Sequence, residues 1–156
     1  MTALILHNIR SVHNVGSIFR TADAAGVEKI FLSGYTPAPL DRFKQPRKDF
    51  AKVSLGAEKT IVWEQIKNLP PLIKRLKHED FMIVAVEQDK DSTSIFDWKQ
   101  KNPQQKIVLV LGNEVRGLSK PTLNLCDKIV EIPMRGKKES LNVSVAAGIA
   151  MFTLLK

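Results

Sequence analysis

The sequence predicts a single α/β domain built around a mostly parallel sheet. Short runs rich in β-branched and other apolar residues alternate along the 156-residue chain with stretches of helical character. The last three runs read as continuously apolar, which is typical of strands covered on both faces. Strands that alternate with helices favour a parallel sheet with helices packed on its faces. Because we find no internal repeat, linker or low-complexity segment, we expect one domain over residues 1–156.

Each predicted strand is a short apolar run bounded by polar or turn-forming residues. These runs cover residues 4–6, 29–32, 61–63, 81–86, 107–111 and 129–132. The stretches that read as helices cover residues 16–25, 64 to about 77, 120–125 and 142–155. Gly26 ends the first helix, and Pro70 and Pro71 either kink or restart the second. The last helix is apolar almost all round, so it is expected to be buried in the core or against a second subunit.

Composition narrows the class of protein. A formal net charge of +8 and an isoelectric point near 9.7 favour polyanionic partners without identifying one. No apolar run approaches the length of about 18 residues that a membrane span needs, and the N-terminus lacks a signal-peptide pattern. We therefore expect a soluble, cytoplasmic protein without a membrane partner. The single cysteine, Cys126, excludes an intrachain disulfide, makes a zinc site a poor prospect, and is expected in the core.

The first segment that suggests chemistry directly follows the first strand. Gly16 permits close backbone approach where a helix begins, and Asn14 can cap that helix. Phe19 then belongs to the apolar face, while Arg20 lies one turn beyond Gly16. An arginine at a buried helix end needs an anionic or carbonyl partner, so we expect Arg20 to have one.

The second segment is a turn between Gly112 and Gly117 that follows the strand at 107–111. Ligands of open α/β sheets bind beyond the carboxyl ends of the strands, so a cofactor is expected here. Taken alone, however, the turn is a weak signal. The fragment 56–60 is weaker still, because it lacks the earlier glycine of a phosphate-binding loop.

The third segment places polar residues at the N-terminus of the last predicted helix. A strand that stops at Pro133 leads through a basic loop to Ser140 and Asn142. The first turn of a helix carries unpaired N–H groups, so either residue could be the N-cap, and a bound acceptor is the alternative. The strand end at 132–134 would lie beside the second segment if their two strands are neighbours.

Together the three segments resemble the SpoU/TrmH family of the SPOUT methyltransferases. The match agrees in order, spacing and strand context, and it extends over residues 4–155, so we expect no additional RNA-binding domain or long terminal extension. The matching residues are Asn14, Gly16, Arg20 and Thr21, then Leu111, Gly112, Glu114, Gly117 and Leu118, then Ile132, Pro133, Met134, Ser140, Leu141 and Asn142.

The resemblance implies S-adenosylmethionine as the methyl donor and the 2′-hydroxyl of an RNA ribose as the acceptor. It also implies a deep trefoil knot in the C-terminal half of the chain. General topology rules argue against knots, so the strand and helix pattern by itself predicts an ordinary doubly wound sheet.

The resemblance also implies the site residues. Because arginine is effectively never deprotonated, we interpret Arg20 as a phosphate clamp and electrostatic stabiliser and assign no general base, with His7, His13 and His78 as weaker candidates. The implied catalytic residues are Arg20, Asn14, Glu114, Ser140 and Asn142. The implied cofactor-binding residues, several of them acting through the backbone, are Leu111, Gly112, Asn113, Gly117, Ile132, Met134, Ser140 and Leu141.

Basic residues are expected to bind RNA mainly through its phosphates. Most lie in the long segment 34–50, for which a solvated surface loop is the alternative reading. The tryptophans and the tyrosine show no spacing that suggests a stacking platform for bases. The apolar last helix and the resemblance both favour a homodimer whose active site is completed across the interface. The predicted RNA-binding residues are Arg10, Arg42, Lys44, Arg47 and Lys48.

Other functions stay open. Compact single-domain members of the family often act on tRNA, which favours tRNA as the substrate and leaves rRNA as the alternative. A non-catalytic RNA-binding module with the same fold is a different class, but the retained Asn14, Arg20, Glu114, Ser140 and Asn142 argue against it. A nicotinamide-dependent dehydrogenase is weaker, since no Gly-x-Gly-x-x-Gly turn follows the first strand.

Overall fold

A computed structural model describes residues 1–100 and 102–155, in which one sheet carries the fold. Its strands are β1 (Thr2–His7), β2 (Lys29–Ser33), β3 (Val62–Ile66), β4 (Phe81–Val86), β5 (Thr93–Ser94), β6 (Lys106–Leu111) and β7 (Lys128–Glu131). They follow the order β3-β2-β1-β6-β4-β7-β5, and each neighbouring pair is parallel. The predicted parallel α/β sheet is therefore confirmed.

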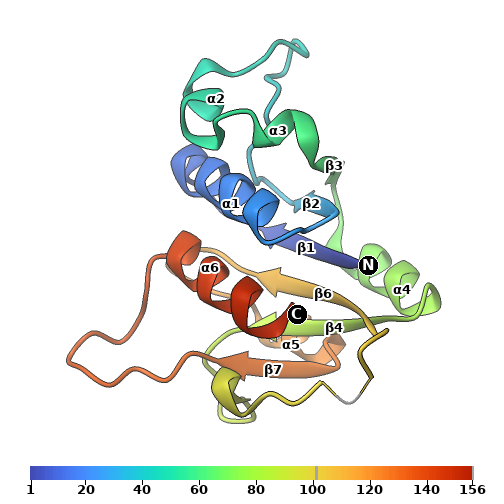
Figure 1. The fold of residues 1–156 in the computed structure, drawn as a ribbon, viewed down its shortest axis with the longest axis vertical. Coiled ribbons are helices and arrows are strands. Elements are labelled where there is room, and N and C mark those ends of the chain that lie inside the picture. The colour runs from blue at the N-terminus through green and yellow to red at the C-terminus, as the bar shows by residue number, and fades with distance from the viewer. Residues whose placement is uncertain (101, 156) are drawn as a thin grey trace.

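Helices cover both faces of this sheet. They are α1 (Val12–Ala24), α2 (Lys48–Ser54), α3 (Ala57–Thr60), α4 (Leu69–His78), α5 (Lys120–Leu125) and α6 (Val143–Leu154), with a short 3₁₀ helix η1 (Ile95–Asp97). In Figure 1, α1 and α6 lie together in front of the sheet, while α5 lies behind it. None of the helices in the described ranges combines the length and apolar character needed to cross a bilayer.

Two hydrophobic cores result, one on each face. In β1, the side chains of Leu4 and Leu6 pack with α1 and α6, while Ala3 and Ile5 pack with α4 and α5 on the other face. All four are fully buried, as the period of two along a strand requires. Cys126 packs against the second core, where burial raises the pKa of its thiol to about 11. That thiol therefore stays protonated and unreactive at neutral pH.

The predicted helix from residue 64 to about 77 is wrong in its first part. Residues 64–66 belong to the edge strand β3, and α4 begins at Leu69. Pro70 and Pro71 occupy the first turn of α4, where a missing N–H group is tolerated, so they restart the chain as a helix instead of kinking one. Four short elements, α2, α3, β5 and η1, were not predicted.

The cap of the first helix was also predicted wrongly. Helix α1 begins at Val12, four residues earlier than expected, and its N-cap is Ser11, whose side chain accepts a hydrogen bond from the backbone N–H of Asn14 at 3.2 Å. The side chain of Asn14 is therefore free for another role. At the last helix, Asn142 is the N-cap, as one of the two readings predicted, because its Oδ1 accepts from the backbone N–H of Ser144 at 2.8 Å.

Close contact between α1 and α2 depends on Gly16. A β-carbon at this position would lie 3.1 Å from Cβ of Val53 and 3.3 Å from the carbonyl oxygen of Phe50. The aromatic ring of Phe50 then packs edge-on against Phe19, with 5.1 Å between ring centroids. The groove between these two helices holds Arg20 and is described below.

We predict that Gly16→Val lowers the free energy of unfolding by about 1–3 kcal/mol, because the added side chain must push α2 away from α1. Urea denaturation measures the change. Gly148→Ala is the matched control, since its added methyl would meet Cγ2 of Thr21 at an ordinary 3.5 Å. The control should stabilise the protein by up to about 1 kcal/mol through helix propensity. A Gly16→Val protein as stable as wild type would contradict this packing.

Candidate functional site

A cavity of about 380 Å³ lies at the carboxyl ends of β4, β6 and β7. This is the position where ligands bind in open α/β sheets. The strands β6 and β7 are not neighbours, because β4 pairs with both of them. The second and third segments nevertheless line the same cavity, since the loops that follow their strands both reach over the end of β4.

The structure brings together the residues that were predicted to bind the cofactor. All eight line this cavity, together with residues that sequence reasoning did not identify. The predicted members are Leu111, Gly112, Asn113, Gly117, Ile132, Met134, Ser140 and Leu141. The additional members are Val86, Glu87, Gln88, Val115, Arg116, Glu131, Glu139, Val143 and Ala146, and Glu114, predicted as a catalytic residue, lines the cavity as well.

One wall of the cavity is the turn from Gly112 to Gly117. A β-carbon on Gly112 would lie 2.7 Å from the carbonyl carbon of Gly117, so no larger residue fits at that position without moving the backbone. Gly117 has a φ of 62°, a left-handed conformation that glycine adopts without strain. The side chain of Asn113 closes the turn, because its Oδ1 accepts from the backbone N–H groups of Val115 and Arg116, both at 2.9 Å.

Glu87 supports the far side of this turn. Its Oε2 accepts from the backbone N–H of Leu118 at 2.9 Å, and its Oε1 accepts from that of Gln88 at the same distance. A β-carbon on Gly117 would overlap the Glu87 carboxylate. The signal that could have revealed Glu87 is its position directly after the buried strand β4, at the edge of the sheet where ligands bind.

The charge of the cavity is opposite to that of the protein. Four glutamates line it, Glu87, Glu114, Glu131 and Glu139, against the single cation Arg116, although the whole chain carries +8. The apolar part of the lining comes from Leu111, Ile132, Leu141 and neighbouring residues. This combination suits a ligand that has an apolar portion and a positive charge.

A chain of hydrogen bonds joins the three segments beside the cavity. Oε1 of Glu114 accepts from Nδ2 of Asn14 at 3.1 Å, and Oδ1 of Asn14 accepts from Nδ2 of Asn142, also at 3.1 Å. Oδ1 of Asn142 in turn accepts from the backbone N–H of Ser144. A carboxylate can only accept, so it determines the orientation of the Asn14 amide, and Asn14 determines that of Asn142.

Glu114 also binds the backbone of the loop that precedes α1. Its two carboxylate oxygens accept from the backbone N–H groups of Arg10 and Ser11, each at 3.1 Å. Burial opposes ionisation of the Glu114 carboxyl, but these two N–H groups and the amide of Asn14 outweigh it, so the pKa lies below its usual value. Glu114 is therefore a charged hydrogen-bond acceptor at neutral pH.

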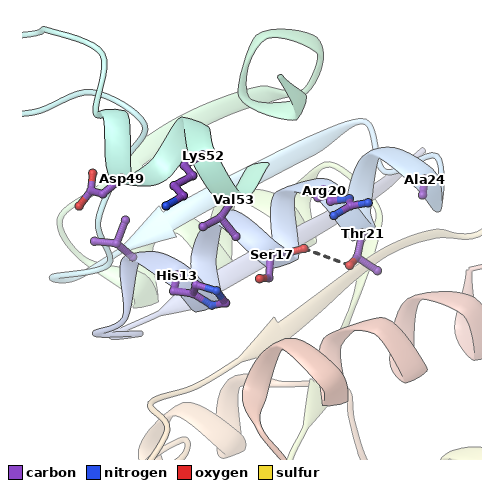
Figure 2. A pocket seen from close by; sticks show the side chains of 9 residues that line it. His13, Ser17, Arg20, Thr21, Ala24, Asp49, Lys52 and Val53 are labelled. Carbon is purple, nitrogen blue, oxygen red and sulfur yellow. Dashed lines mark hydrogen bonds between the residues drawn. The ribbon is translucent and has the colours of Figure 1, made fainter. Parts of the chain in front are cut away.

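The structure does not bring Arg20 into this cavity. Arg20 is exposed on α1, where it lines a separate groove of about 970 Å³ between α1 and α2 with His13, Ser17 and Lys52. Figure 2 shows these side chains, together with the hydrogen bond from Oγ1 of Thr21 to the carbonyl of Ser17. The expectation of a buried helix end with a partner for Arg20 is wrong, because α1 ends only at Ala24 and its solvent-facing side carries Arg20.

The remaining predicted residues differ in their surroundings. Ser140 lines the cavity and is exposed, and the described residues offer its side chain no hydrogen bond. Arg10, Arg42, Lys44 and Lys48 are exposed and accessible to a polyanion. Arg47 is less available, because it donates two hydrogen bonds to Asp49, at 3.2 and 2.9 Å, which also raise its pKa.

His7 is not among the residues that line the cavity or the Arg20 groove. Its Nε2 accepts from Nδ2 of Asn8 at 3.1 Å, so its Nδ1–H donates to Oγ of Ser33 at 3.0 Å. Burial lowers the pKa of the His7 imidazole, which favours this neutral form. Both ring nitrogens are therefore committed to structure, and His7 is a poor candidate for a general base.

Comparison with known proteins gives consistent matches. The sequence model of the SpoU rRNA Methylase family matches residues 1–152. The 23S rRNA (guanosine-2′-O-)-methyltransferase RlmB of Escherichia coli is 34% identical over 153 residues, which cover 98% of this chain and 59% of RlmB. The chain thus spans about three fifths of the length of that relative.

Comparison with solved structures also finds RNA-modifying enzymes. The AdoMet-bound rRNA methyltransferase from Sinorhizobium meliloti has 28% identity and a TM-score of 0.86, with 97% of this chain and 54% of that chain covered. The TrmH/SpoU tRNA modifying enzyme of A. aeolicus has 29% identity and a TM-score of 0.82, with 97% of this chain and 72% of that chain covered.

We predict that Glu114→Gln lowers the free energy of unfolding by about 1–3 kcal/mol at neutral pH, because an amide cannot accept all three N–H groups. The pKa of Glu114 is lowered in the folded state, so its contribution is present at neutral pH and is lost as the pH falls through that pKa. The difference between variant and wild type should therefore shrink in acid.

Urea denaturation at neutral and acidic pH measures this difference. Glu139→Gln is the matched control, because it removes the same charge from the cavity wall at an exposed position. Its stability should equal that of wild type at both values. A Glu114→Gln difference that persists unchanged in acid would contradict the role of the ionised carboxylate.

Proposed function

Because the chain belongs to the SpoU rRNA Methylase family, we propose that it transfers the methyl group of S-adenosylmethionine to the 2′-hydroxyl of a ribose in RNA. The observation that carries the proposal is one acidic cavity lined by the second and third segments, to which the Glu114–Asn14–Asn142 hydrogen bonds join the first segment. The match to RlmB and to an AdoMet-bound rRNA methyltransferase supports both the reaction and the donor.

The cavity fits S-adenosylmethionine in size and chemistry. Its volume of about 380 Å³ lies within the range of about 300–1,000 Å³ that is usual for small-molecule sites. Leu111, Ile132 and Leu141 would contact the adenine, while Glu131 and Glu139 would face the positive charges of the donor. When bound, the donor supplies a methyl group made electrophilic by its sulfonium.

Backbone groups of the loop after β7 would provide further contacts. Figure 1 shows this loop extending beyond the strand ends before the chain enters α6. Within the described ranges, the backbones of Met134 and Leu141 form no hydrogen bond with another residue. They are thus available to polar groups of the adenine or the methionine moiety. We propose that the predicted cofactor-binding residues act in this way.

The polar chain beside the cavity would orient the acceptor. A ribose 2′-hydroxyl is a weak nucleophile, so its position relative to the donor carries much of the catalysis. We assign Asn14, Asn142 and Ser140 to hold the ribose, with Glu114 fixing the orientation of Asn14. Arg20 stays protonated and would neutralise an RNA phosphate beside the acceptor. The base that removes the proton is unassigned.

A homodimer would reconcile the position of Arg20 with this role. Val145 and Phe152 on α6 are 50% and 60% exposed, although α6 is almost entirely apolar. The Arg20 groove is close to α6, since Thr21 lies against Gly148. Pairing of two subunits through α6 would cover this apolar surface and allow Arg20 of one subunit to serve the cavity of the other.

The substrate that we favour is ribosomal RNA. The sequence alone favoured tRNA because the domain is small, but RlmB acts on 23S rRNA and the S. meliloti protein is an rRNA methyltransferase. tRNA is the second candidate, supported by the A. aeolicus tRNA modifying enzyme. We also propose a cytoplasmic location, in keeping with either substrate. We also propose the trefoil knot of the C-terminal half on the strength of family membership.

We predict that the purified chain with radiolabelled S-adenosylmethionine labels unmodified rRNA transcripts more strongly than unmodified tRNA transcripts. Nuclease digestion and mass spectrometry should identify a ribose 2′-O-methyl nucleoside. Gly112→Val is the control, because its side chain would displace the turn, and it should weaken donor binding at least about tenfold in calorimetry. Donor binding without transfer to any RNA would favour the non-catalytic module.

We predict that Arg20→Ala lowers methyl transfer by two or more orders of magnitude, on the order expected for loss of a charge-stabilising group, while leaving donor affinity intact. Mixing the Arg20→Ala and Gly112→Val proteins should then restore about a quarter of the wild-type rate, because half of the dimers are mixed and hold one intact site. No recovery after subunit exchange would place Arg20 and the cavity of the same subunit in one site.

A further inference from the structure

A second hollow adjoins the turn from Gly112 to Gly117 on its outer side. It is lined by Arg10, Tyr35, Asn113, Val115 and Arg116, and its volume is about 610 Å³. Three of these residues, Asn113, Val115 and Arg116, also line the acidic cavity. The two sites therefore share the turn as a common wall, which places the outer hollow next to the point where methyl transfer would occur.

Tyr35 is held in this hollow although it is 59% exposed. Its backbone N–H donates to Oδ1 of Asn8 at 3.2 Å, and its hydroxyl oxygen accepts from Nδ2 of Asn113 at 3.1 Å. The orientation of the Asn113 amide is determined, because its Oδ1 already accepts from two backbone N–H groups. The hydroxyl hydrogen of Tyr35 is consequently free to donate to a ligand.

The loop that carries Tyr35 is tied to the loops after β1 and β6. Nδ2 of Asn113 donates to the carbonyl of Asn8 at 2.9 Å as well as to Tyr35. An exposed aromatic ring that is fixed at its backbone and its hydroxyl has little freedom to lose when a ligand binds. The ring of Tyr35 is therefore held in position before a ligand binds.

The rim of the hollow is cationic and partly apolar. The side chains of Arg10 and Arg116 are exposed, and neither forms an ion pair with any residue in the described ranges. Val115 is 85% exposed at the tip of the turn. A flat aromatic ring, an exposed aliphatic side chain and two unpaired guanidinium groups match the base and the phosphates of an unpaired nucleotide.

From this geometry we propose that the hollow is a nucleobase subsite of the substrate RNA, in which an unpaired base near the methylated ribose stacks on Tyr35 and its flanking phosphates contact Arg10 and Arg116. This proposal rests on the proposed function, because it identifies how the same enzyme would bind its RNA acceptor. Stacking on Tyr35 would supply affinity for any base, and the free Tyr35 hydroxyl would supply specificity.

Tyr35 is the only tyrosine of the chain, so fluorine-labelled tyrosine gives a single NMR signal from the subsite. A single-stranded RNA oligonucleotide of mixed sequence should shift this signal through the ring current of a stacked base. Inorganic polyphosphate, which carries the charges without bases, should leave it nearly unmoved. Arg116→Ala should weaken the RNA titration roughly fivefold, the effect of about one phosphate contact. An equal shift with polyphosphate, or no shift at saturating RNA, would overturn the proposal.

Methyl transfer provides the second readout. Tyr35→Ala should raise KM for RNA about tenfold or more with kcat and donor affinity little changed, whereas Tyr35→Phe, which keeps the ring, should stay within about threefold of wild type. Phe96→Leu is the matched control, since Phe96 is 57% exposed on η1, next to β5 at the opposite edge of the sheet. An unchanged KM in Tyr35→Ala would also overturn the subsite.

The two readouts separate this proposal from the proposed function. If RNA is methylated but neither the signal nor KM responds, the subsite is wrong and the function stands. If no RNA is methylated but the signal shifts with RNA and not with polyphosphate, the function is wrong and the subsite stands.

Discussion

The carboxylate of Glu114 is the group on which the arrangement of the site depends. It is about 100 residues away in sequence from the three groups that it accepts from, and it draws the loop before α1 onto the turn after β6. Hydrogen bonds to a charged acceptor contribute about 1.5–3 kcal/mol each, more than bonds between neutral groups. Because the acceptor is ionised, the amides of Asn14 and Asn142 can adopt only one orientation each. One charge thus determines which groups donate and which accept in a hydrogen-bond network that extends to the N-terminus of α6.

The proposed reaction would require the same molecule to attract two ligands of opposite charge. The proposed donor is a cation, and RNA is a polyanion, so a uniformly basic surface would favour the acceptor and repel the donor. The structure places four glutamates around the inner cavity, whose lining holds only one cation, Arg116, while Arg10 and Arg116 lie on the outer hollow. The two surfaces adjoin, because Arg116 lies on the wall that they share. Negative charge therefore predominates on one side of a single turn and positive charge on the other.

Patterns within one element were predictable from the sequence. Apolar runs predicted most of the strands, and a ligand site was expected at the turn after β6 because ligands of open α/β sheets bind beyond the carboxyl ends of the strands. The individual residues around the cavity were implied by the family resemblance. Errors arose where a choice depended on distant partners. Residues 64–66 join β3 because an edge position on β2 was available to them, and Asn14 does not cap α1 because Ser11 does. Tyr35 was missed because its partner Asn113 is 78 residues away, whereas Glu87 was missed although its position directly after β4 could have revealed it.

Asn113 shows why the turn after β6 can connect donor and acceptor. Its Oδ1 shapes the turn whose inner side lines the cavity, while its Nδ2 holds Asn8 and Tyr35 on the outer side. The proposed donor cavity and the proposed RNA hollow thus share one hydrogen-bonded turn, so loss of the Asn113 amide would disturb both of them. The amide is small, but it is the one side chain that hydrogen-bonds to the loops after β1, β2 and β6 together within the described residues.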